Sequence, residues 1–384
     1  MPTQNAVAPK LMSRVLFLYF VSAFGSMTSF YLLLSVVPLF ATAAGAGRTG
    51  AGLTTGALML ATVVAELATP ALLARFGYRA VLSAGLVLLG APAFALTVSA
   101  GLGTILAVCL VRGVGLAILV VAGSALVATV VPLERRSEGL GILGLVVGVP
   151  AVVALPLGLW LAERLGFPPV FVAGAVASLA CLAVMPALPG REAGAAQPVG
   201  VVEGLRTPAQ TRPALIFLLT AMATGIVVTF LPLAMRSSAR LAALALLANT
   251  IATTVARWWA GRYGLRHGQG NLLVGGVVVA AIGMLALGVI ENPIAVGLGA
   301  VLLGMGFGVA QNSSLALMFE RASVSGYDMV SAVWNLAYDA GLGLGAAGFG
   351  VVVVRAGYSS AFAIAAALML AALAPVWLRR GWLR

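Results

Sequence analysis

Long uninterrupted apolar runs recur from one end of the chain to the other, separated by short polar stretches. A run of about 18 or more apolar residues can cross the hydrocarbon core of a bilayer, about 30 Å thick, as one α-helix. The pattern predicts twelve such helices. In the first half they cover residues 14–41, 51–73, 80–100, 104–131, 139–162 and 168–188, and in the second half 213–235, 241–260, 271–290, 294–319, 328–353 and 360–378.

The composition indicates an all-α membrane protein. Hydrophobic residues make up 62% of the chain and charged residues only 8%, whereas soluble domains contain about 25% charged residues. The net charge of +12 would indicate nucleic-acid binding in a soluble protein. Arginines gathered in the loops on one side of a membrane account for it better. We therefore expect the lipid bilayer as the partner of this chain, and no nucleic acid.

One long polar segment divides the chain. PGREAGAAQPVGVVEGLRTPAQTRP, residues 189–213, is rich in Pro, Gly and Ala and carries charges, which is typical of a linker. The predicted organisation is an N-terminal six-helix bundle over 1–188, a cytoplasmic linker over 189–212 and a C-terminal six-helix bundle over 213–384.

The distribution of basic residues predicts the orientation. An even number of helices puts both termini on one side, and the loops on that side contain most of the arginines. The opposite loops contain Arg48, Arg164, Arg236, Arg240 and Arg355. Because cytoplasmic loops carry the excess of Lys and Arg, we expect both termini in the cytoplasm. No small-residue cleavage site follows the first apolar run, so it is expected to stay as a membrane span.

Short basic motifs recur at about half the chain length. ARFGYR (74–79) returns 187 residues later as GRYGLR (261–266), and RLGFPPVF (164–171) returns 191 residues later as RAGYSSAF (355–362). SVVPLF, with Pro38, is echoed more weakly by TFLPLA, with Pro232. A general preference of helix turns for Arg and Gly is the alternative explanation. The common order and sidedness favour two copies of a six-helix unit, related by an axis along the membrane normal.

Twelve spans, a parallel repeat of six and a basic loop after spans 2 and 8 resemble the major facilitator superfamily over almost the whole chain. That family carries the motif G-x-L-A-D-R-x-G-R-K-x-x-L, approximately, between spans 2 and 3. It aligns with PALLARFGYRAVL, residues 70–82. The match comprises Leu72, Arg75, Gly77, Arg79 and Leu82, whereas Pro70 and Ala74 replace the family's Gly and Asp. The resemblance implies the major facilitator fold and transport of a small molecule by alternating access.

The missing Asp bears on the gate. In the family that the chain resembles, this carboxylate lies near the cytoplasmic start of span 11 and helps to latch the two halves. Here the start of span 11 has its own acid, Asp328. We expect a cytoplasmic gate of Arg75, Gly77, Arg79 and Asp328, in which Asp328 faces one of the arginines when that side is closed. The alternative is a helix cap, which a helix N-terminus also favours.

Two further motifs match the family in part. Arg112, in CLVRGVGLAI, resembles its buried span-4 arginine, although Leu116 stands where a Gly is usual. GILGLVVGVPAVVALPLG (141–158) has the Gly and Pro content of the span-5 antiporter motif but lacks the contiguous G-P-x-x-G-G. The resemblance implies an exporter of the bacterial drug- or sugar-efflux branch. Packing of small residues between helices is the alternative for span 5.

Ionisable residues inside the apolar runs are candidates for proton coupling. A charge at the bilayer centre costs at least about 2.5–3.5 kcal/mol, so such a side chain usually faces a cavity or a partner. The candidates are Asp339, Glu66 and Arg112, the last as a possible partner of a carboxylate. Asp339 is eleven residues beyond Asp328, about 16 Å along a helix and thus near the midplane. A fixed structural role is the alternative for each.

Polar and aromatic residues in the same spans predict the substrate cavity. The segment WNLAYD places an amide and two aromatic rings beside Asp339. The candidates are Ser26, Tyr31, Asn249, Gln311, Asn312, Trp334, Asn335 and Tyr338. Ordinary hydrogen bonding between helices is the alternative for each. Arg257, in ARWWAG, is instead expected to anchor the membrane interface together with Trp258 and Trp259.

Other functional classes lack the residues that they need. The single lysine, Lys10, leaves no phosphate-binding G-x-x-x-x-G-K-[ST] loop, and the single histidine, His267, lies in a loop. We therefore expect neither an ATP-driven pump nor an enzyme, and no metal. No cofactor is expected, and the proton gradient is the expected energy source.

The sequence as a whole predicts a secondary active transporter that exports a small molecule in exchange for protons. A proton-coupled importer of a small nutrient is the alternative with the same fold. The near-exclusive use of Arg over Lys is typical of GC-rich bacterial genomes. The expected location is the plasma (inner) membrane of a bacterium, with a multi-pass monomer as the expected form.

Overall fold

The computed structural model describes residues 13–131, 136–188, 190, 206–235, 238–322 and 327–374, without the side chains of 128, 136–141, 262–267 and 327–328. Every regular element in these ranges is a helix. The all-α fold expected from the apolar runs is therefore confirmed.

The helix boundaries follow the polar punctuation of the sequence. The first half contains α1 (Arg14–Leu34), α2 (Val36–Ala41), the π-helix η1 (Thr42–Ala46), α3 (Gly47–Gly90), the 3₁₀ helix η2 (Ala91–Phe94), α4 (Ala95–Val98), α5 (Leu102–Val130), α6 (Arg136–Leu165), α7 (Phe167–Leu179) and the 3₁₀ helix η4 (Ala180–Ala187). The second half contains α9 (Pro208–Ala234), α10 (Ala239–His267), α11 (Gln269–Leu287), α12 (Pro293–Glu320) and α13 (Tyr327–Ala371). A polar cap fixes the start of α12, where Asn292 Oδ1 accepts the Ile294 N–H at 3.0 Å.

Nine helical runs in the described ranges are long and apolar enough to cross a membrane. Two of them exceed a single crossing: Arg14–Val98 has 85 residues and Met329–Ala371 has 43. The first bends at Gly45 (φ 93°) and Gly77 (φ 77°), and the second at Gly357 (φ 73°). Division at these glycines reproduces the expected spans closely, while the count of twelve crossings stays a prediction.

One of the repeated motifs has the same backbone in both halves. Gly166, in RLGFPPVF, has φ 81° and ψ 180°, and Gly357, in RAGYSSAF, has φ 73° and ψ 173°. An L-residue with a Cβ rarely adopts this conformation, so Gly is required at both turns. The pair ARFGYR and GRYGLR differs: the first half turns at Gly77, whereas α10 runs through its copy and the turn falls at Gly268 (φ 82°).

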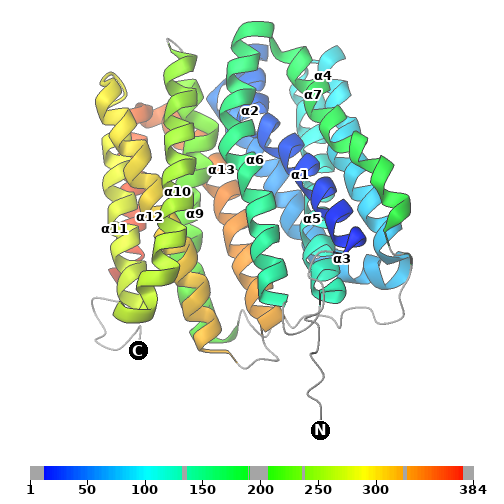
Figure 1. Cartoon of the computed structure of the whole chain (residues 1–384). Coiled ribbons are helices and arrows are strands. Elements are labelled where there is room, and N and C mark those ends of the chain that lie inside the picture. The colour runs from blue at the N-terminus through cyan, green and yellow to red at the C-terminus, as the bar shows by residue number, and fades with distance from the viewer. Residues whose placement is uncertain are drawn as a thin grey trace.

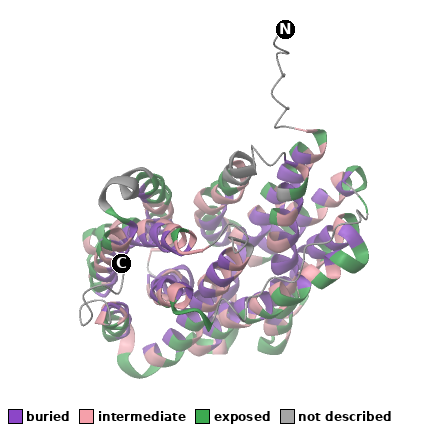
Figure 2. Ribbon diagram, turned by 90° about the horizontal axis from the view of Figure 1, so that it is seen from below, coloured by how far each residue is buried: buried purple, intermediate pink, exposed green. Residues whose placement is uncertain are grey.

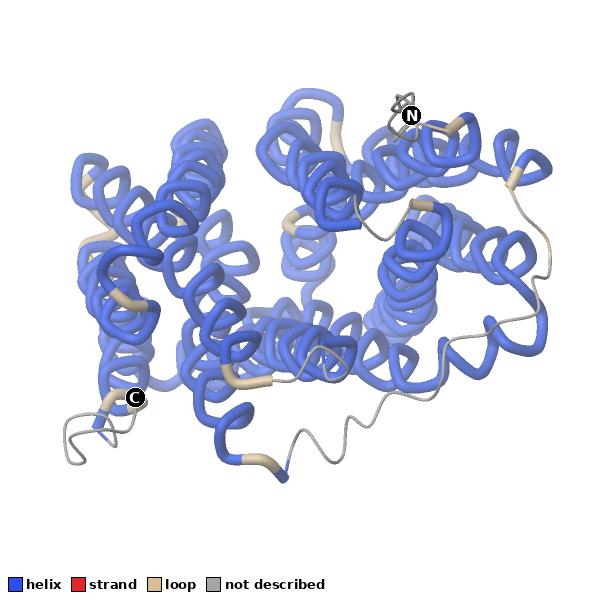
Figure 3. Tube along the Cα trace, turned by 60° about the horizontal axis from the view of Figure 1, so that its bottom comes forward, coloured by secondary structure: helices blue, strands red, loops and turns tan. Residues whose placement is uncertain are grey.

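Figure 1 shows the elements in two groups, α1–α7 on one side and α9–α12 on the other, with α13 reaching between them. The tube view in Figure 3, in which the bottom of the Figure 1 view comes forward, shows the same division. The most extensive contacts between the halves are those of α3 with α13 and of α6 with α10. By span number these pairs are 2 with 11 and 5 with 8. In a parallel repeat, a rotation about the membrane normal superimposes spans 1–6 on spans 7–12 and the reverse. Span 2 then falls on span 8 and span 11 on span 5, so the rotation turns one of these pairs into the other.

Large apolar side chains cover the periphery of the molecule. Figure 2 shows exposed residues mostly along the outer faces of the helices and buried residues toward the interior. Examples of exposed apolar side chains are Leu60, Val98, Leu145 and Ile294, at 62%, 85%, 65% and 73% exposed. Such a continuous apolar exterior fits contact with lipid and not with water.

Helices α3 and α13 touch backbone to backbone at one end of the molecule. We call this end the distal face and the opposite end, where α1 begins, the terminal face (Figure 1). A Cβ at Gly52 would overlap the carbonyl oxygen of Ala346 and lie 3.3 Å from the Gly350 Cα. Thr49 Oγ1 also donates to the Gly350 carbonyl at 3.3 Å. We name the contact of α3 residues 48–59 with α13 residues 343–358 the distal seam.

Hydrogen bonds between α9 and the first half also join the two halves near the distal face. The hydroxyls of Thr55 and Thr229 are 2.9 Å apart, and Ser35 Oγ donates to the Val228 carbonyl at 2.7 Å. Both bonds join the two halves and are buried. The two halves are therefore held together on the distal side by close packing and by polar contacts.

A glycine substitution tests the distal seam. We expect Gly52→Ala to lower the free energy of unfolding by about 1–3 kcal/mol, because its methyl group has no room against α13. The matched control is Gly348→Ala, on an exposed face of α13 with no atom within 4 Å. The control should be neutral or slightly stabilising, since Ala is the better helix former. Thermal unfolding in detergent measures both, and equal melting temperatures would contradict the seam.

Candidate functional site

Two acids from different halves meet in the interior. The carboxyl groups of Glu66, on α3, and Asp339, on α13, are in hydrogen-bond contact. The Oε1 atom of Glu66 is buried and has no hydrogen-bond partner in the described part of the chain. An ionised carboxylate only accepts hydrogen bonds, so a bond between the two requires a proton on one of them. We call Glu66 and Asp339 the acid pair.

Helix geometry explains why the two acids meet. Glu66 precedes the bend at Gly77 by eleven residues, and Asp339 follows the start of α13 at Tyr327 by twelve. At 1.5 Å per residue, both lie about 16–18 Å from the terminal face, near the middle of a membrane. On the distal side of the pair, Gly343 packs against the Met59 side chain. The acid pair thus marks the point where the distal seam ends.

Two tyrosines and an arginine lie close to the acid pair. Tyr31, on α1, and Tyr338, on α13, each interact electrostatically with both Asp339 and Arg257. Arg257, on α10, has a solvent-exposed side chain that is nevertheless within reach of both tyrosines. Contrary to the expectation from its Trp neighbours, Arg257 therefore faces the interior. The sequence reasoning missed it because the adjacent tryptophans are typical of an interfacial anchor.

A cavity of about 210 Å³ lies between α1, α5 and α6 and reaches Asn335 of α13. Its polar wall includes Tyr19, Ser22, Ser26 and Ser124 from the first half and Asn335 from the second. Asn335 is one helical turn before Asp339, on the same face of α13. Of the expected cavity residues, the structure thus places Ser26 and Asn335 in this cavity, and Tyr31 and Tyr338 beside the acid pair.

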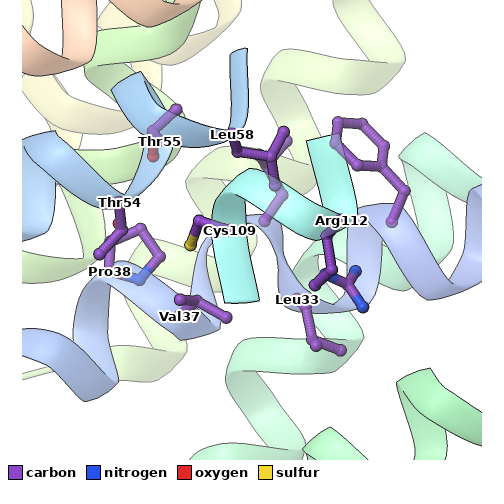
Figure 4. Close-up of a pocket in the computed structure, with 10 residues that line it drawn as sticks. Leu33, Val37, Pro38, Thr54, Thr55, Leu58, Cys109 and Arg112 are labelled. Atoms are coloured by element: carbon purple, nitrogen blue, oxygen red, sulfur yellow. The ribbon is translucent and has the colours of Figure 1, made fainter. Parts of the chain in front are cut away.

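Arg112 has a different environment. Its side chain is 1% exposed, and its guanidinium donates to the carbonyl oxygens of Leu89, at 2.5 Å, and Ser29, at 3.2 Å. It borders a second, very small cavity of about 10 Å³ together with Cys109 (Figure 4). The structure does not bring Arg112 to Glu66 or Asp339. Its backbone partners make it a tie between α1, α3 and α5.

Trp334 belongs to an aromatic stack in the second half. Its ring lies 4.7 Å from that of Phe217, with an interplanar angle of 9°, and Phe217 also stacks on Phe307 and Tyr338 at 6.0 Å. The indole Nε1 of Trp334 donates to Ser314 Oγ at 3.0 Å. Trp334 is 8% exposed, and its ring stacks on that of Tyr338 at 6.3 Å, so it helps to fix the position of the Tyr338 ring.

Comparison with known families decides the class of this protein. A sequence model of the Major Facilitator Superfamily matches residues 19–346. The chain belongs to the major facilitator superfamily. It is therefore a multi-pass membrane transporter and not an enzyme, as the sequence predicted. No curated protein sequence matches it.

Solved transporters share the fold of this superfamily member at low sequence identity. The nucleoside transporter NupG is 14% identical, with 94% of this chain and 99% of that chain covered and a TM-score of 0.74. A POT family transporter in complex with 5-aminolevulinic acid is 13% identical, with 95% of this chain and 96% of that chain covered and a TM-score of 0.79. A partially occluded inward-open form of the xylose transporter XylE from E. coli is 13% identical, with 96% of this chain and 98% of that chain covered and a TM-score of 0.76. These likenesses concern the fold alone.

Other predicted site residues of the transporter have different surroundings. Asn249 is buried and donates to the Ala300 carbonyl at 2.9 Å, so it joins α10 to α12. Gln311 and Asn312 are half-buried on α12. They are not among the residues that border the 210 Å³ cavity. Asn249 is also absent from the lining of this cavity, and a role of the three amides in substrate binding stays a prediction.

The expected cytoplasmic gate is described in part. Arg79 donates through Nε and Nη2 to the Leu188 carbonyl, at 3.1 and 2.7 Å, so it holds the end of the first half. The guanidinium of Arg75 lies 5.2 Å from the Phe76 ring, and Gly77 forms the bend. The side chain of Asp328 is outside the described residues. A latch between Asp328 and an arginine stays a prediction.

Adjacent serines of the transporter test the aromatic stack. Ser314→Ala should lower the free energy of unfolding by about 1–3 kcal/mol, because it leaves the buried Trp334 N–H without its acceptor. The matched control is Ser313→Ala, since the Ser313 hydroxyl is equally buried and has no partner. That change should be neutral or stabilising. Thermal melts of the two variants compare them, and a costlier Ser313→Ala would contradict the assignment.

Proposed function

We propose that this transporter couples the movement of a small molecule to protons through the acid pair. The observation that carries the proposal is the hydrogen-bond contact between Glu66 and Asp339, one from each half of the molecule. A proton-binding site between two bodies that move against each other links protonation directly to their relative position.

The proton has a simple physical role at this position. Two ionised carboxylates in contact repel each other, and the repulsion is strong where protein and lipid keep the local dielectric low. One shared proton replaces that repulsion with a hydrogen bond. Around the pair, Tyr31 and Tyr338 supply hydroxyls and Arg257 a positive charge. The protonated pair therefore favours contact of α3 with α13.

The pattern of packed and unpacked glycines supports alternating access. On α6, Gly158 near the distal end packs against the Leu32 backbone, whereas Gly144 and Gly148, nearer the terminal face, have no atom within 4 Å. The seam between α3 and α13 is likewise tight on the distal side of the acid pair. The terminal part of α6 thus has free space beside these two glycines, which allows the movement that we propose for the alternate state.

We infer the orientation in the membrane and the direction of transport from features of the sequence. With both termini in the cytoplasm, the described state is closed to the outside and faces inward. The Gly- and Pro-rich helix α6 favours export of the cargo in exchange for protons across a bacterial plasma membrane. In such a cycle the protonated carrier returns inward, releases its proton and then carries cargo outward. An importer would carry proton and cargo inward together.

A distance measurement tests the acid pair without knowledge of the cargo. Spin labels are placed at Gly103→Cys on α5 and Gly297→Cys on α12, near the distal face, where neither position has an atom within 4 Å. The native Cys109 and Cys181 are buried. Raising the pH should lengthen the distance between the labels, because loss of the shared proton pushes α3 from α13.

Neutral variants complete this test. In the double variant Glu66→Gln, Asp339→Asn, the distance should stay short at every pH, since an amide pair keeps an uncharged hydrogen bond. The matched control Glu291→Gln, in an exposed loop, should keep the response of the wild type. A pH-independent distance in the wild type, or an unchanged response in the double variant, would exclude the acid pair as the coupling site.

Transport assays decide the direction. Proteoliposomes with an imposed pH gradient and a panel of labelled solutes should show solute moving against the proton flow if the protein is an exporter. Movement with the proton flow would identify an importer instead. Asp339→Asn should abolish the coupled proton movement in either case.

A further inference from the structure

Arg257 is a cation without a fixed partner in the interior of the bundle. It makes no ion pair and no hydrogen bond within the described part of the chain. Arg112 provides the contrast, since it is closed off at 1% exposure with two carbonyl acceptors. A charged side chain at membrane depth usually faces a partner or a substrate path. Arg257 has access to solvent, so its partner can arrive from outside the protein.

The groups around Arg257 are hydrogen-bond donors. The guanidinium has five N–H donors and no acceptor. The hydroxyls of Tyr31 and Tyr338 are within electrostatic reach and make no hydrogen bond in the described residues. The nearby Glu66 and Asp339 contact each other, and Arg257 forms no ion pair with either of them. Donor groups from three elements, α1, α10 and α13, thus lie within electrostatic reach of one another, and the Arg257 side chain among them is exposed.

We propose that Arg257, Tyr31 and Tyr338 bind an oxyanion of the cargo, and that the cargo is a small organic anion. The inference rests on the proposed function, because it assigns the cargo of the same transport cycle. The anion site is nevertheless distinct from the proton site: the guanidinium holds the charged group, and the acid pair holds the proton.

Charge favours an anion over a cation here. A cationic cargo at this place would meet the positive guanidinium of Arg257, which has no ion pair within the described residues, and this repulsion costs free energy. A carboxylate instead accepts two parallel N–H bonds from the guanidinium and further bonds from the tyrosines. Asn335, which precedes Tyr338 by three residues on α13, borders the 210 Å³ cavity, and we assign the neutral part of the cargo to this cavity. The ring of Tyr338, held by its stack, offers a flat apolar wall.

Three probes of nearly equal shape test the sign of the charge. Benzoate is an anion, benzamide is neutral and benzamidine is a cation at neutral pH. Each is added to the purified full-length protein in detergent, and its affinity is taken from the concentration dependence of the melting temperature. Benzoate should bind at least about tenfold more tightly than either of the other two, as one charge-assisted bidentate contact predicts.

Variants assign the effect to Arg257. Arg257→Gln should remove the preference for benzoate. Arg257→Lys should retain part of it, because lysine keeps the positive charge but lacks the two parallel N–H donors of the guanidinium. The matched control Arg240→Gln, an exposed arginine on the same helix, should leave the preference unchanged. The melting temperature without probe shows whether each variant is folded, and Arg257→Lys keeps the test valid if Arg257→Gln is not.

The proposal is overturned if benzoate stabilises the protein no more than benzamide does, or if Arg257→Gln keeps the benzoate preference. The spin-label experiment separates this result from the proposed function. A pH-dependent distal distance that the amide variant abolishes, with no preference for benzoate, would leave proton coupling standing and reject the anionic cargo. A benzoate preference without that pH dependence would support the anion site and reject the acid pair as the coupling device.

Discussion

The contact between α3 and α13 determines the arrangement of this transporter. Gly52 and Gly350 remove the side chains that would keep the two helices apart, so their backbones meet near the distal face. The same crossing brings Glu66 against Asp339 a few turns further along. Two ionised carboxylates in contact repel each other where the dielectric is low. Close packing of uncharged residues thus brings together the two acids on which the proposed proton coupling depends.

The two helix seams give the molecule an asymmetry along the membrane normal. Toward the distal face, glycines pack on the backbone of the other half or of neighbouring helices, and the hydroxyls of Thr55 and Thr229 join the halves. Toward the terminal face, Gly144 and Gly148 of α6 have free space beside them. A parallel repeat allows both seams to open and close together, because one rotation exchanges them. In the cycle that we propose, alternating access is a change in which end of the α3–α13 and α6–α10 contacts is packed.

The interior charges show three solutions to the cost of burial. Arg112 is surrounded by protein and satisfied by the carbonyls of Leu89 and Ser29. Glu66 and Asp339 contact each other, although the buried Oε1 atom of Glu66 has no partner in the described residues. Arg257 keeps access to solvent and no fixed acceptor. In the cycle that we propose, only the last two arrangements change with the surroundings, through a proton or an arriving anion. A structural role suits Arg112, and working roles suit the others.

The sequence alone determined the helical membrane fold, the family and the depth of the key acids. Periodic apolar runs and helical rise are local properties, so they place Asp339 near the midplane without knowledge of its neighbours. Tertiary structure decided which side chains meet. It paired Asp339 with Glu66, turned Arg257 toward Tyr31 and Tyr338, and tied Asn249 to α12 instead of the cavity. In a chain that is apolar on every helix face, hydrophobic periodicity does not distinguish lipid from interior. The rotation of each helix is therefore set by the fit of small residues against neighbouring backbones, which appears only when the helices are packed.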